Sequence, residues 1–198
     1  INKLRAYSDP AQTVLQQSDD NDVVSTRYRH AIAHYRRGNL QLAYELMDAL
    51  SETTPNDPFY HEFRGDILMS MAKPNAATVA YEKALVLRPS SPQIQLNLGR
   101  SLIATNDKKL LPRAIEAMIA AKRAEPDWAF IHRQLAIAYG RAGQIANADL
   151  SLAEEAILLG DEQQAVRMAK RVLAKANLAR DVQNRANDIL FSFGKALR

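Results

Sequence analysis

Cysteine is absent from the chain, and its absence excludes disulfide bonds, cysteine-based zinc sites and thiol catalysis. No run of about 18 apolar residues occurs, so the sequence predicts no membrane-spanning helix. Glycine is scarce, with seven residues scattered along the chain rather than gathered in a phosphate-binding loop. An excess of one charge is also missing, because 26 basic side chains stand against 22 acidic ones and the signs are interspersed. This balance points away from a nucleic-acid-binding protein, which usually concentrates basic residues on one face.

Three sets of residues recur along the chain at a nearly constant spacing. The prolines Pro55, Pro89 and Pro126 are separated by 34 and 37 residues. Two sets of small residues repeat with the same spacings, and all three sets agree if three extra residues (37 − 34 = 3) lie between Gly99 and Ala114. The small residues are Ala31, Gly65, Gly99 and Ala136 in one set and Ala43, Ala77, Ala114 and Ala148 in the other.

A period of 34 with small residues at two places and a closing proline resembles the tetratricopeptide repeat (TPR) family. Two antiparallel helices approach closely only where side chains are small, and proline ends the second helix because it has no backbone donor. Gly38 and Gly143 are predicted in the turns inside two of the pairs. The resemblance implies an all-α fold, a TPR-type α-solenoid superhelix of antiparallel helix pairs with a C-terminal capping helix.

The repeat divides the chain into a leading segment and an array. Residues 1–22 lack the repeat and are predicted to be a polar linker from an upstream domain. Because the first residue is Ile1 rather than Met, we expect the chain to be a fragment or a processed product. Residues 23–198 are predicted to form the array, with units at 24–57, 58–91, 92–128 and 129–159, a degenerate unit at 146–177 and a capping helix at 180–195.

A TPR array binds other proteins on its concave face, which the first helix of each pair lines. We expect Arg100, Arg133 and Arg141 to hold carboxylates of a ligand, and Asn97 and Gln134 to bond to its backbone, so the expected ligand is a peptide or an acidic loop. The alternative is that these charges only solvate the groove. By resemblance to the family, the predicted groove residues are Tyr28, Ile32, Tyr35, Arg36, Glu62, Asp66, Met69, Leu96, Asn97, Arg100, Ile103, Phe130, Arg133, Gln134, Ile137 and Arg141.

Two histidines, His30 and His34, lie one helical turn apart, a spacing that can chelate zinc. We interpret them as structural, because Ala31 stands where the zinc-peptidase motif HExxH has its glutamate and no third ligand is evident nearby. No catalytic residue, metal site or cofactor is therefore predicted in this chain.

Adjacent carboxylates occur at Asp19 and Asp20 and at Glu154 and Glu155. They fall on expected linker or outer helix positions, so we interpret them as solvated rather than as an acid–base pair. Trp128 follows a predicted corner and is interpreted as a wedge between repeats.

Three segments have a narrower resemblance: INKLRAYSDP, RYRHAIAHYRRGNLQLA and WAFIHRQLAIAYGRAGQIANADLSLAEEAILLGD. They resemble the C-terminal TPR region of bacterial zinc metalloproteases of the BepA/YfgC type. The resemblance implies a periplasmic location, an upstream HExxH peptidase domain that holds the zinc, and partners among outer-membrane protein assembly factors or unfolded clients. The lack of cysteine fits the cytoplasm as well as the periplasm.

Three hypotheses for function remain open. The first is a protein–protein interaction module of a zinc-dependent protease, and the second is a free-standing TPR scaffold in envelope assembly or secretion. An HExxH domain upstream of Ile1 would favour the first. The third hypothesis, an enzyme with His30 and His34 as ligands, predicts activity or metal that is lost when both are replaced. A final helix with Ile189 and Leu190 could cap the array or pair with a second copy.

Overall fold

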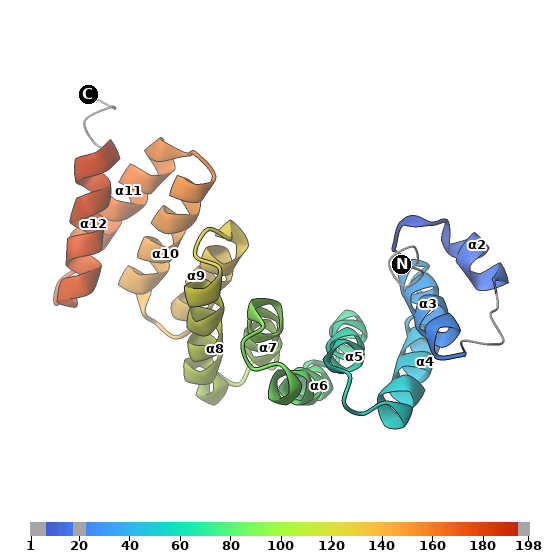
Figure 1. The fold of residues 1–198 in the computed structure, drawn as a ribbon. Helices are drawn as coiled ribbons and strands as arrows, with labels where there is room; N and C mark the ends of the chain where they lie inside the picture. The colour runs from blue at the N-terminus through green and yellow to red at the C-terminus, as the bar shows by residue number, and fades with distance from the viewer. Residues whose placement is uncertain (1–6, 18–22, 194–198) are drawn as a thin grey trace. The chain divides into compact units, whose positions relative to one another are not determined.

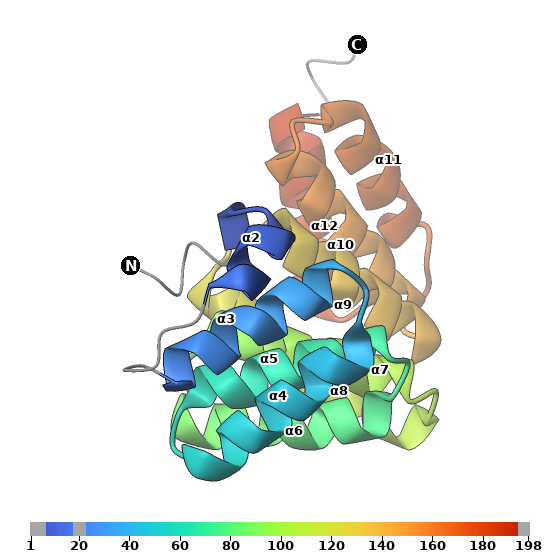
Figure 2. The same ribbon diagram turned by 90° about the vertical axis from the view of Figure 1, so that its right-hand side faces the viewer.

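The computed structural model describes residues 7–17 and 23–193, and in these ranges the chain forms helices joined by short turns, with no β-strand (Figure 1, Figure 2). The predicted all-α class is confirmed. Within the same ranges, every helix is too short or too polar to cross a membrane. In chain order the elements are α2 (Ala11–Gln16), α3 (Val23–Arg36), α4 (Leu40–Thr53), α5 (Pro58–Ser70), α6 (Pro74–Leu87), α7 (Pro92–Ala104), the 3-10 helix η1 (Lys108–Leu110), α8 (Leu111–Ala124), α9 (Ala129–Arg141), α10 (Ile145–Leu158), α11 (Glu162–Leu173) and α12 (Arg180–Phe193).

Consecutive helices pack as antiparallel pairs, as short turns require. α3 packs on α4, α5 on α6, α9 on α10 and α11 on α12, and further contacts join α4 to α5 and α10 to α11. The chain divides into two compact units, which we call unit 1 (Ile1–Ser101) and unit 2 (Leu102–Arg198), with the division inside α7. The predicted units at 58–91 and 129–159 contain the pairs α5–α6 and α9–α10, and the predicted unit at 24–57 contains the pair α3–α4 except for its first residue, Val23.

The turns inside the helix pairs share one backbone conformation. Gly38, Ala72, Asn106 and Gly143 have positive φ angles of 77°, 55°, 60° and 75°, the left-handed conformation that commonly ends a helix. Their spacings of 34, 34 and 37 repeat the sequence period. Gly38 and Gly143 lie in the turns where the sequence predicts them. The turns at Ala72 and Asn106 were not predicted from the sequence. Alanine rarely takes this conformation, whereas asparagine adopts it more readily.

The three extra residues of the 37-residue spacing are absorbed by one short turn. They follow Asn106, where Lys108–Leu110 forms η1 and the Asp107 side chain accepts a hydrogen bond from the Lys109 amide at 2.9 Å. The helices on either side keep lengths of 13 and 14 residues. The insertion therefore lengthens a connection and leaves the helices of the repeat intact.

Residues 7–17 differ from the predicted polar linker. Ala11–Gln16 forms α2, which packs on α3, and Val14 is fully buried in the same hydrophobic cluster as Met47. One short apolar stretch inside a polar segment is too brief to show a helical period, so the sequence pattern missed this helix. Residues 1–6 and 18–22, which include the predicted solvated pair Asp19 and Asp20, lie outside the described residues.

α12 closes the other end of the chain as the predicted capping helix. Val182, Ala186 and Ile189 are buried against α10 and α11, and Leu190 is partly buried beside them. Positions 194–195 of the predicted helix lie outside the described residues. The apolar side of α12 is thus covered by its own unit.

Three first helices are tied to the proline before them in the same way. A side-chain nitrogen donates to the carbonyl oxygen of the proline six residues earlier. The sequence pattern identified the prolines but not these donors, because glutamine and histidine alternate in the role. The pairs are His61 with Pro55 (2.8 Å), Gln95 with Pro89 (2.9 Å) and His132 with Pro126 (3.0 Å).

Candidate peptide-binding groove

The predicted groove residues of unit 1 lie on α3, α5 and α7. Glu62, Asp66 and Met69 are half-buried and share one face of α5, because they are four and three residues apart. Tyr28 of α3 is nearly buried, and its ring centroid lies 5.4 Å from that of Tyr60 on α5. Aromatic packing therefore joins the two helices beneath the polar groups of the groove.

At the C-terminal end of α3, Tyr35 and Arg36 make further contacts. The Tyr35 hydroxyl lies 2.9 Å from Ser70 Oγ at the end of α5, and its ring meets Phe63 edge-on with the centroids 5.4 Å apart. Arg36 is exposed and Nη1 donates to the backbone carbonyl of Asp9 at 2.5 Å. Both predicted groove residues are accessible on this face, and Arg36 already binds a backbone carbonyl, that of Asp9.

Asp66 is the centre of a hydrogen-bond network in unit 1. Its Oδ1 accepts from the Tyr81 hydroxyl at 2.7 Å and from Asn97 Nδ2 at 3.4 Å. Arg100 Nη1 donates to Asn97 Oδ1 at 3.2 Å. Burial raises the pKa of the Asp66 carboxyl, and the Tyr81 hydrogen bond and the Arg100 charge oppose that rise. Both the Nδ2 and the Oδ1 of Asn97 are thus used within the network, so they compete with the predicted bonds to a ligand backbone.

Glu62, one turn before Asp66 on α5, has a different environment. Among the described residues, no hydrogen bond or ion pair reaches its carboxylate. Burial raises the pKa of Glu62 to about 7, the charge of Asp66 adds to the rise, and Arg88 opposes it. A half-buried carboxyl without a partner is available to bond with an incoming donor.

Five predicted groove residues are buried in the structure. Besides Tyr28 (8% exposed) and Asn97 (3%), they are the apolar side chains Ile32 and Leu96, which have no exposed surface, and Ile103, which is 6% exposed. Ile32 belongs to the cluster that also holds Val14 of α2, a helix that the sequence pattern missed. These three apolar side chains stabilise the core and cannot line a surface.

In unit 2 the predicted groove residues form an exposed stripe along α9. Phe130 and Ile137 are 38% and 41% exposed, and Gln134 lies half-buried between them. Spacings of four, three and four residues place Phe130, Gln134, Ile137 and Arg141 on one face of the helix. The opposite face is buried, with Ile131, Leu135 and Ala138 in the core.

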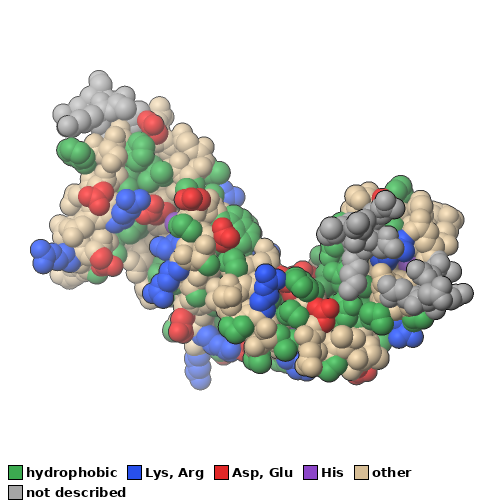
Figure 3. Space-filling model, viewed as in Figure 1, with side chains coloured by type: hydrophobic (Ala, Val, Ile, Leu, Met, Phe, Trp, Pro, Cys, Tyr) green, Lys and Arg blue, Asp and Glu red, His purple; other side chains and the backbone are tan. Residues whose placement is uncertain are grey.

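The three arginines expected to bind ligand carboxylates all have partners within the protein. Arg133 Nε lies 2.5 Å from Glu155 Oε1, and Arg141 Nη1 donates to the Ile103 carbonyl at 2.8 Å and to Asn106 Oδ1 at 3.0 Å. Arg100 belongs to the Asp66 network of unit 1. Figure 3 shows acidic and basic side chains mixed on the face that it draws. Recognition of an acidic ligand by these arginines stays a prediction, with competing acceptors already in place.

The prediction that Glu154 and Glu155 are solvated is wrong. Glu155 is only 7% exposed and pairs with Arg133, and the half-buried Glu154 accepts two bonds from Arg185 of α12, at 2.6 and 2.9 Å. Asp149, also on α10, pairs with Arg171 of α11 at 2.9 Å. α10 therefore carries three carboxylates, each bound by an arginine from a different neighbouring helix. Partners 22 to 31 residues away leave no local sequence signal.

The histidine pair on α3 makes contacts typical of structural side chains. His30 Nε2 lies 3.0 Å from the Gln17 carbonyl, and Asn39 Nδ2 lies 3.5 Å from His34 Nδ1. Burial lowers the pKa of His34, helped by His30 and Arg37. Within the described ranges no three His, Cys, Asp or Glu side chains gather as a metal site would need. Trp128 is half-buried at the position before α9 begins.

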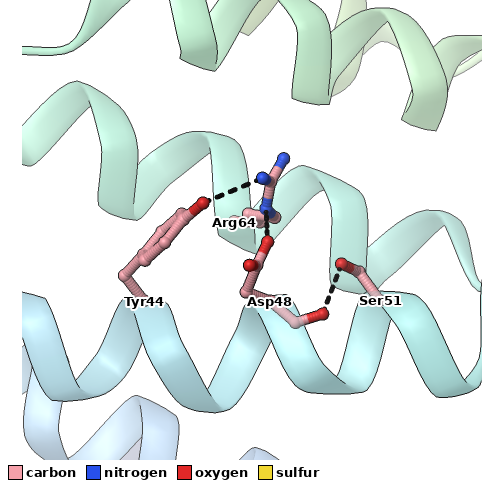
Figure 4. A network of polar contacts seen from close by, with 4 residues as sticks. All are labelled: Tyr44, Asp48, Ser51 and Arg64. Carbon is pink, nitrogen blue, oxygen red and sulfur yellow. Dashed lines mark hydrogen bonds and ion pairs between the residues drawn. The ribbon is translucent and has the colours of Figure 1, made fainter.

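A second recess, which the sequence analysis missed, lies on the side of the second helices in unit 1. It has a volume of about 520 Å³ between α4, α5 and α6. Arg64 lines it, with Nε 2.6 Å from Asp48 Oδ1 and Nη2 donating to the Tyr44 hydroxyl at 2.9 Å (Figure 4). Ser51 Oγ donates to the Asp48 carbonyl at 2.8 Å. This arginine thus fastens α5 to α4.

Solved structures with a similar fold support the repeat assignment. MamA AMB-1 matches with a TM-score of 0.70 and 20% identity, over 80% of this chain and 93% of that one. MamA 41-end from Desulfovibrio magneticus RS-1 matches with a TM-score of 0.65 and 19% identity, over 90% and 96%. YrrB, a TPR protein with an unusual peptide-binding site, matches with a TM-score of 0.65 and 14% identity, over 76% of each chain. No protein-family model and no curated protein matches the sequence. At these identities the likeness shows the fold alone, and the chain has a TPR-like fold.

Proposed function

We propose that this chain is a protein–protein interaction module that binds extended segments of other proteins along the exposed faces of its first helices. The observation that carries the proposal is the stripe on α9, where Phe130 and Ile137 face water while the opposite side of the helix fills the core. Apolar contacts between polar groups such as Gln134 suit a peptide with alternating side chains.

The test compares two isoleucines of equal exposure. Ile137 on the stripe is 41% exposed, and Ile145 at the start of α10 is 42% exposed. Ile137→Asp should reduce capture of partner proteins by the immobilised chain at least about tenfold, whereas Ile145→Asp should leave capture unchanged. Quantitative mass spectrometry of proteins captured from a bacterial envelope extract measures both. Equal capture by the two variants would contradict the proposal, provided that circular dichroism shows equal helix content.

We further propose that the module serves a zinc-dependent protease in the periplasm, with outer-membrane protein assembly factors or unfolded clients as partners. Support comes from the resemblance of three sequence segments to the TPR region of BepA/YfgC-type proteases. On this proposal zinc belongs to a separate peptidase domain, and the present chain is not itself an enzyme. The chain should then fail to cut casein, and a chelator should leave its unfolding midpoint unchanged. Casein cleavage by the purified chain would contradict it.

A free-standing scaffold is the second candidate. It is favoured by the MamA matches, because the aligned region spans 93% and 96% of those chains, so an array of this kind makes up nearly all of each solved structure. The two candidates differ in what the gene encodes before Ile1. An HExxH peptidase domain there supports the protease module, and a signal peptide alone supports the scaffold.

A further inference from the structure

The N-terminal segment, residues 7–9, lies against the groove face of unit 1. The Tyr7 hydroxyl is 3.2 Å from the Tyr28 hydroxyl, and the Asp9 carbonyl accepts a hydrogen bond from Arg36 Nη1 at 2.5 Å. Tyr28 and Arg36 are both residues that the sequence assigns to ligand binding. The chain's own segment therefore uses a side-chain contact and a backbone contact of the kind that a bound peptide would make.

The surroundings of Tyr7 suit a phenol ring. The Tyr7 hydroxyl contacts that of Tyr28 on α3. Burial raises the pKa of the Tyr7 hydroxyl, the Tyr28 hydrogen bond lowers it, and the charges of Asp66 and Glu62 on α5 raise it. The apolar part of the site is built from aromatic rings in edge-to-face contact, with the centroids of Tyr28 and Phe63 6.1 Å apart. A ring with a hydroxyl donor can pack on these side chains and face the two carboxyls.

The contacts that Tyr7 and Asp9 make with Tyr28 and Arg36 are exposed enough to exchange. Tyr7 remains 52% exposed, and the Arg36 bond is exposed as well. A solvent-exposed hydrogen bond changes an equilibrium by about tenfold or less. The following helix α2, with Val14 fully buried, is anchored much more firmly. Residues 7–9 can thus leave the groove while α2 keeps them nearby.

We infer that residues 7–9 are a tethered occupant of the unit 1 groove, and that the external ligand of this site is a peptide that forms a helical turn there, as Tyr7 and Ser8 do, with a tyrosine two residues before the carbonyl that Arg36 binds. The inference rests on the proposed function and specifies its ligand. A tethered segment competes with an effective concentration on the order of millimolar, so an external peptide must displace Tyr7 before it binds.

The experiment uses the full chain, labelled with ¹⁵N, and two synthetic probes: the capped peptide AYSDPA and its alanine counterpart AASDPA. Tyr7→Ala empties the site, and Gln12→Ala, an exposed change on α2, is the matched control. The Tyr7→Ala chain should bind AYSDPA about tenfold more tightly than the wild type and the Gln12→Ala chain do. The amide chemical shifts that change on binding should belong to α3 and α5. AASDPA should bind at least about fivefold more weakly than AYSDPA, and adding Arg36→Met to Tyr7→Ala should weaken AYSDPA to a similar extent.

Two outcomes of the peptide titration overturn the inference. Equal affinity in the wild type and Tyr7→Ala would show that Tyr7 does not occupy the ligand's place. Absence of shifts with both chains at millimolar peptide would show that the site does not accept such a segment. The proposed function is tested separately, on α9. If Ile137→Asp and Ile145→Asp captured partners equally while AYSDPA bound as expected, the proposed function would be contradicted for unit 2 and the inference for unit 1 would remain, because the two tests use different helices.

Discussion

Unit 1 and unit 2 are built from the same kind of helix pair but treat acidic side chains differently. In unit 2, three carboxylates on α10 are each bound by an arginine from another helix. In unit 1, Glu62 has no such partner among the described residues, and burial raises its pKa to about 7. Unit 2 satisfies these charges internally, whereas unit 1 keeps a polar group that a ligand can use.

The difference shows that packing and recognition depend on separate sets of residues in a repeat. The small residues that let helices approach recur in both units, and so do the left-handed turns at Ala72 and Gly143. The charged residues do not follow the repeat. One helix-pair architecture can therefore carry a unit in which three carboxylates of α10 are ion-paired and a unit in which Glu62 is left without such a partner among the described residues.

The largest expected effect is the loss of an ion pair in unit 2. Arg171→Met should lower the free energy of unfolding by about 2–3 kcal/mol, because Asp149 is only 3% exposed and would keep no charged partner. Solvent screening of the half-exposed Arg171 keeps the loss below that of a fully buried pair. In unit 1, Arg64→Met should lower it by about 1 kcal/mol, since the Asp48 side chain is 35% exposed and can be hydrated. Urea denaturation measures both. Equal losses would remove the contrast in how the units use ion pairs.

A second contrast uses one substitution in two places. Gly65→Ala on α5 should destabilise the protein by about 1–3 kcal/mol, because the new Cβ would lie 2.6 Å from the Tyr81 ring. Gly140→Ala on α9 should stabilise it by about 0.5–1 kcal/mol, since nothing lies within 4 Å and alanine favours a helix. Thermal unfolding gives both signs. Destabilisation by both changes would mean that crowding at Tyr81 is not the cause in unit 1.

The sequence predicted the helix pairs well because their cause is local and repeated. Small residues, prolines and turn glycines recur at a fixed spacing, and each acts on its own neighbourhood. It failed where the cause is a distant partner. Ile32 is buried in a cluster with α2, and Glu155 is buried against Arg133. Whether a side chain faces a groove or a neighbouring helix depends on what packs there, and the repeat pattern holds no information about that.

The pH dependence of stability should differ in sign between the two units. The folded-state pKa of Glu62 is raised from 4.5 to about 7, so its contribution to stability is fully present below pH 4.5 and is lost as the pH rises through 7. Glu62→Gln should therefore change little at pH 4 and stabilise the protein at pH 8, by about 1 kcal/mol or less after solvent screening. Urea denaturation at both pH values measures the change.

Glu154→Gln is the matched control from unit 2. Burial acts to raise the pKa of Glu154, but the hydrogen bonds and charge of Arg185 outweigh it and lower the pKa. Its contribution is present above the unfolded pKa and is lost as the pH falls through the lower folded value. The variant should thus be less stable than the wild type at pH 8 and differ less at pH 3. The same pH response in both variants would contradict the division between paired and unpaired carboxyls.

The smallest expected effect lies at the turn of the α5–α6 pair in unit 1, which has alanine where the α9–α10 pair of unit 2 has glycine. Ala72 has a φ of 55°, and a Cβ in this conformation is strained, whereas glycine at 143 adopts φ 75° freely. Ala72→Gly relieves the strain but makes the unfolded chain more flexible, so the net gain should be about 0.5–1 kcal/mol. Ala76→Gly, four residues further on and exposed near the start of α6, should instead destabilise by up to about 1 kcal/mol. Thermal unfolding measures both changes: the melting temperature should rise for Ala72→Gly at the left-handed position and fall for Ala76→Gly in the helix. A loss of stability in both would show that the turn tolerates Cβ, and that the repeat does not require glycine there.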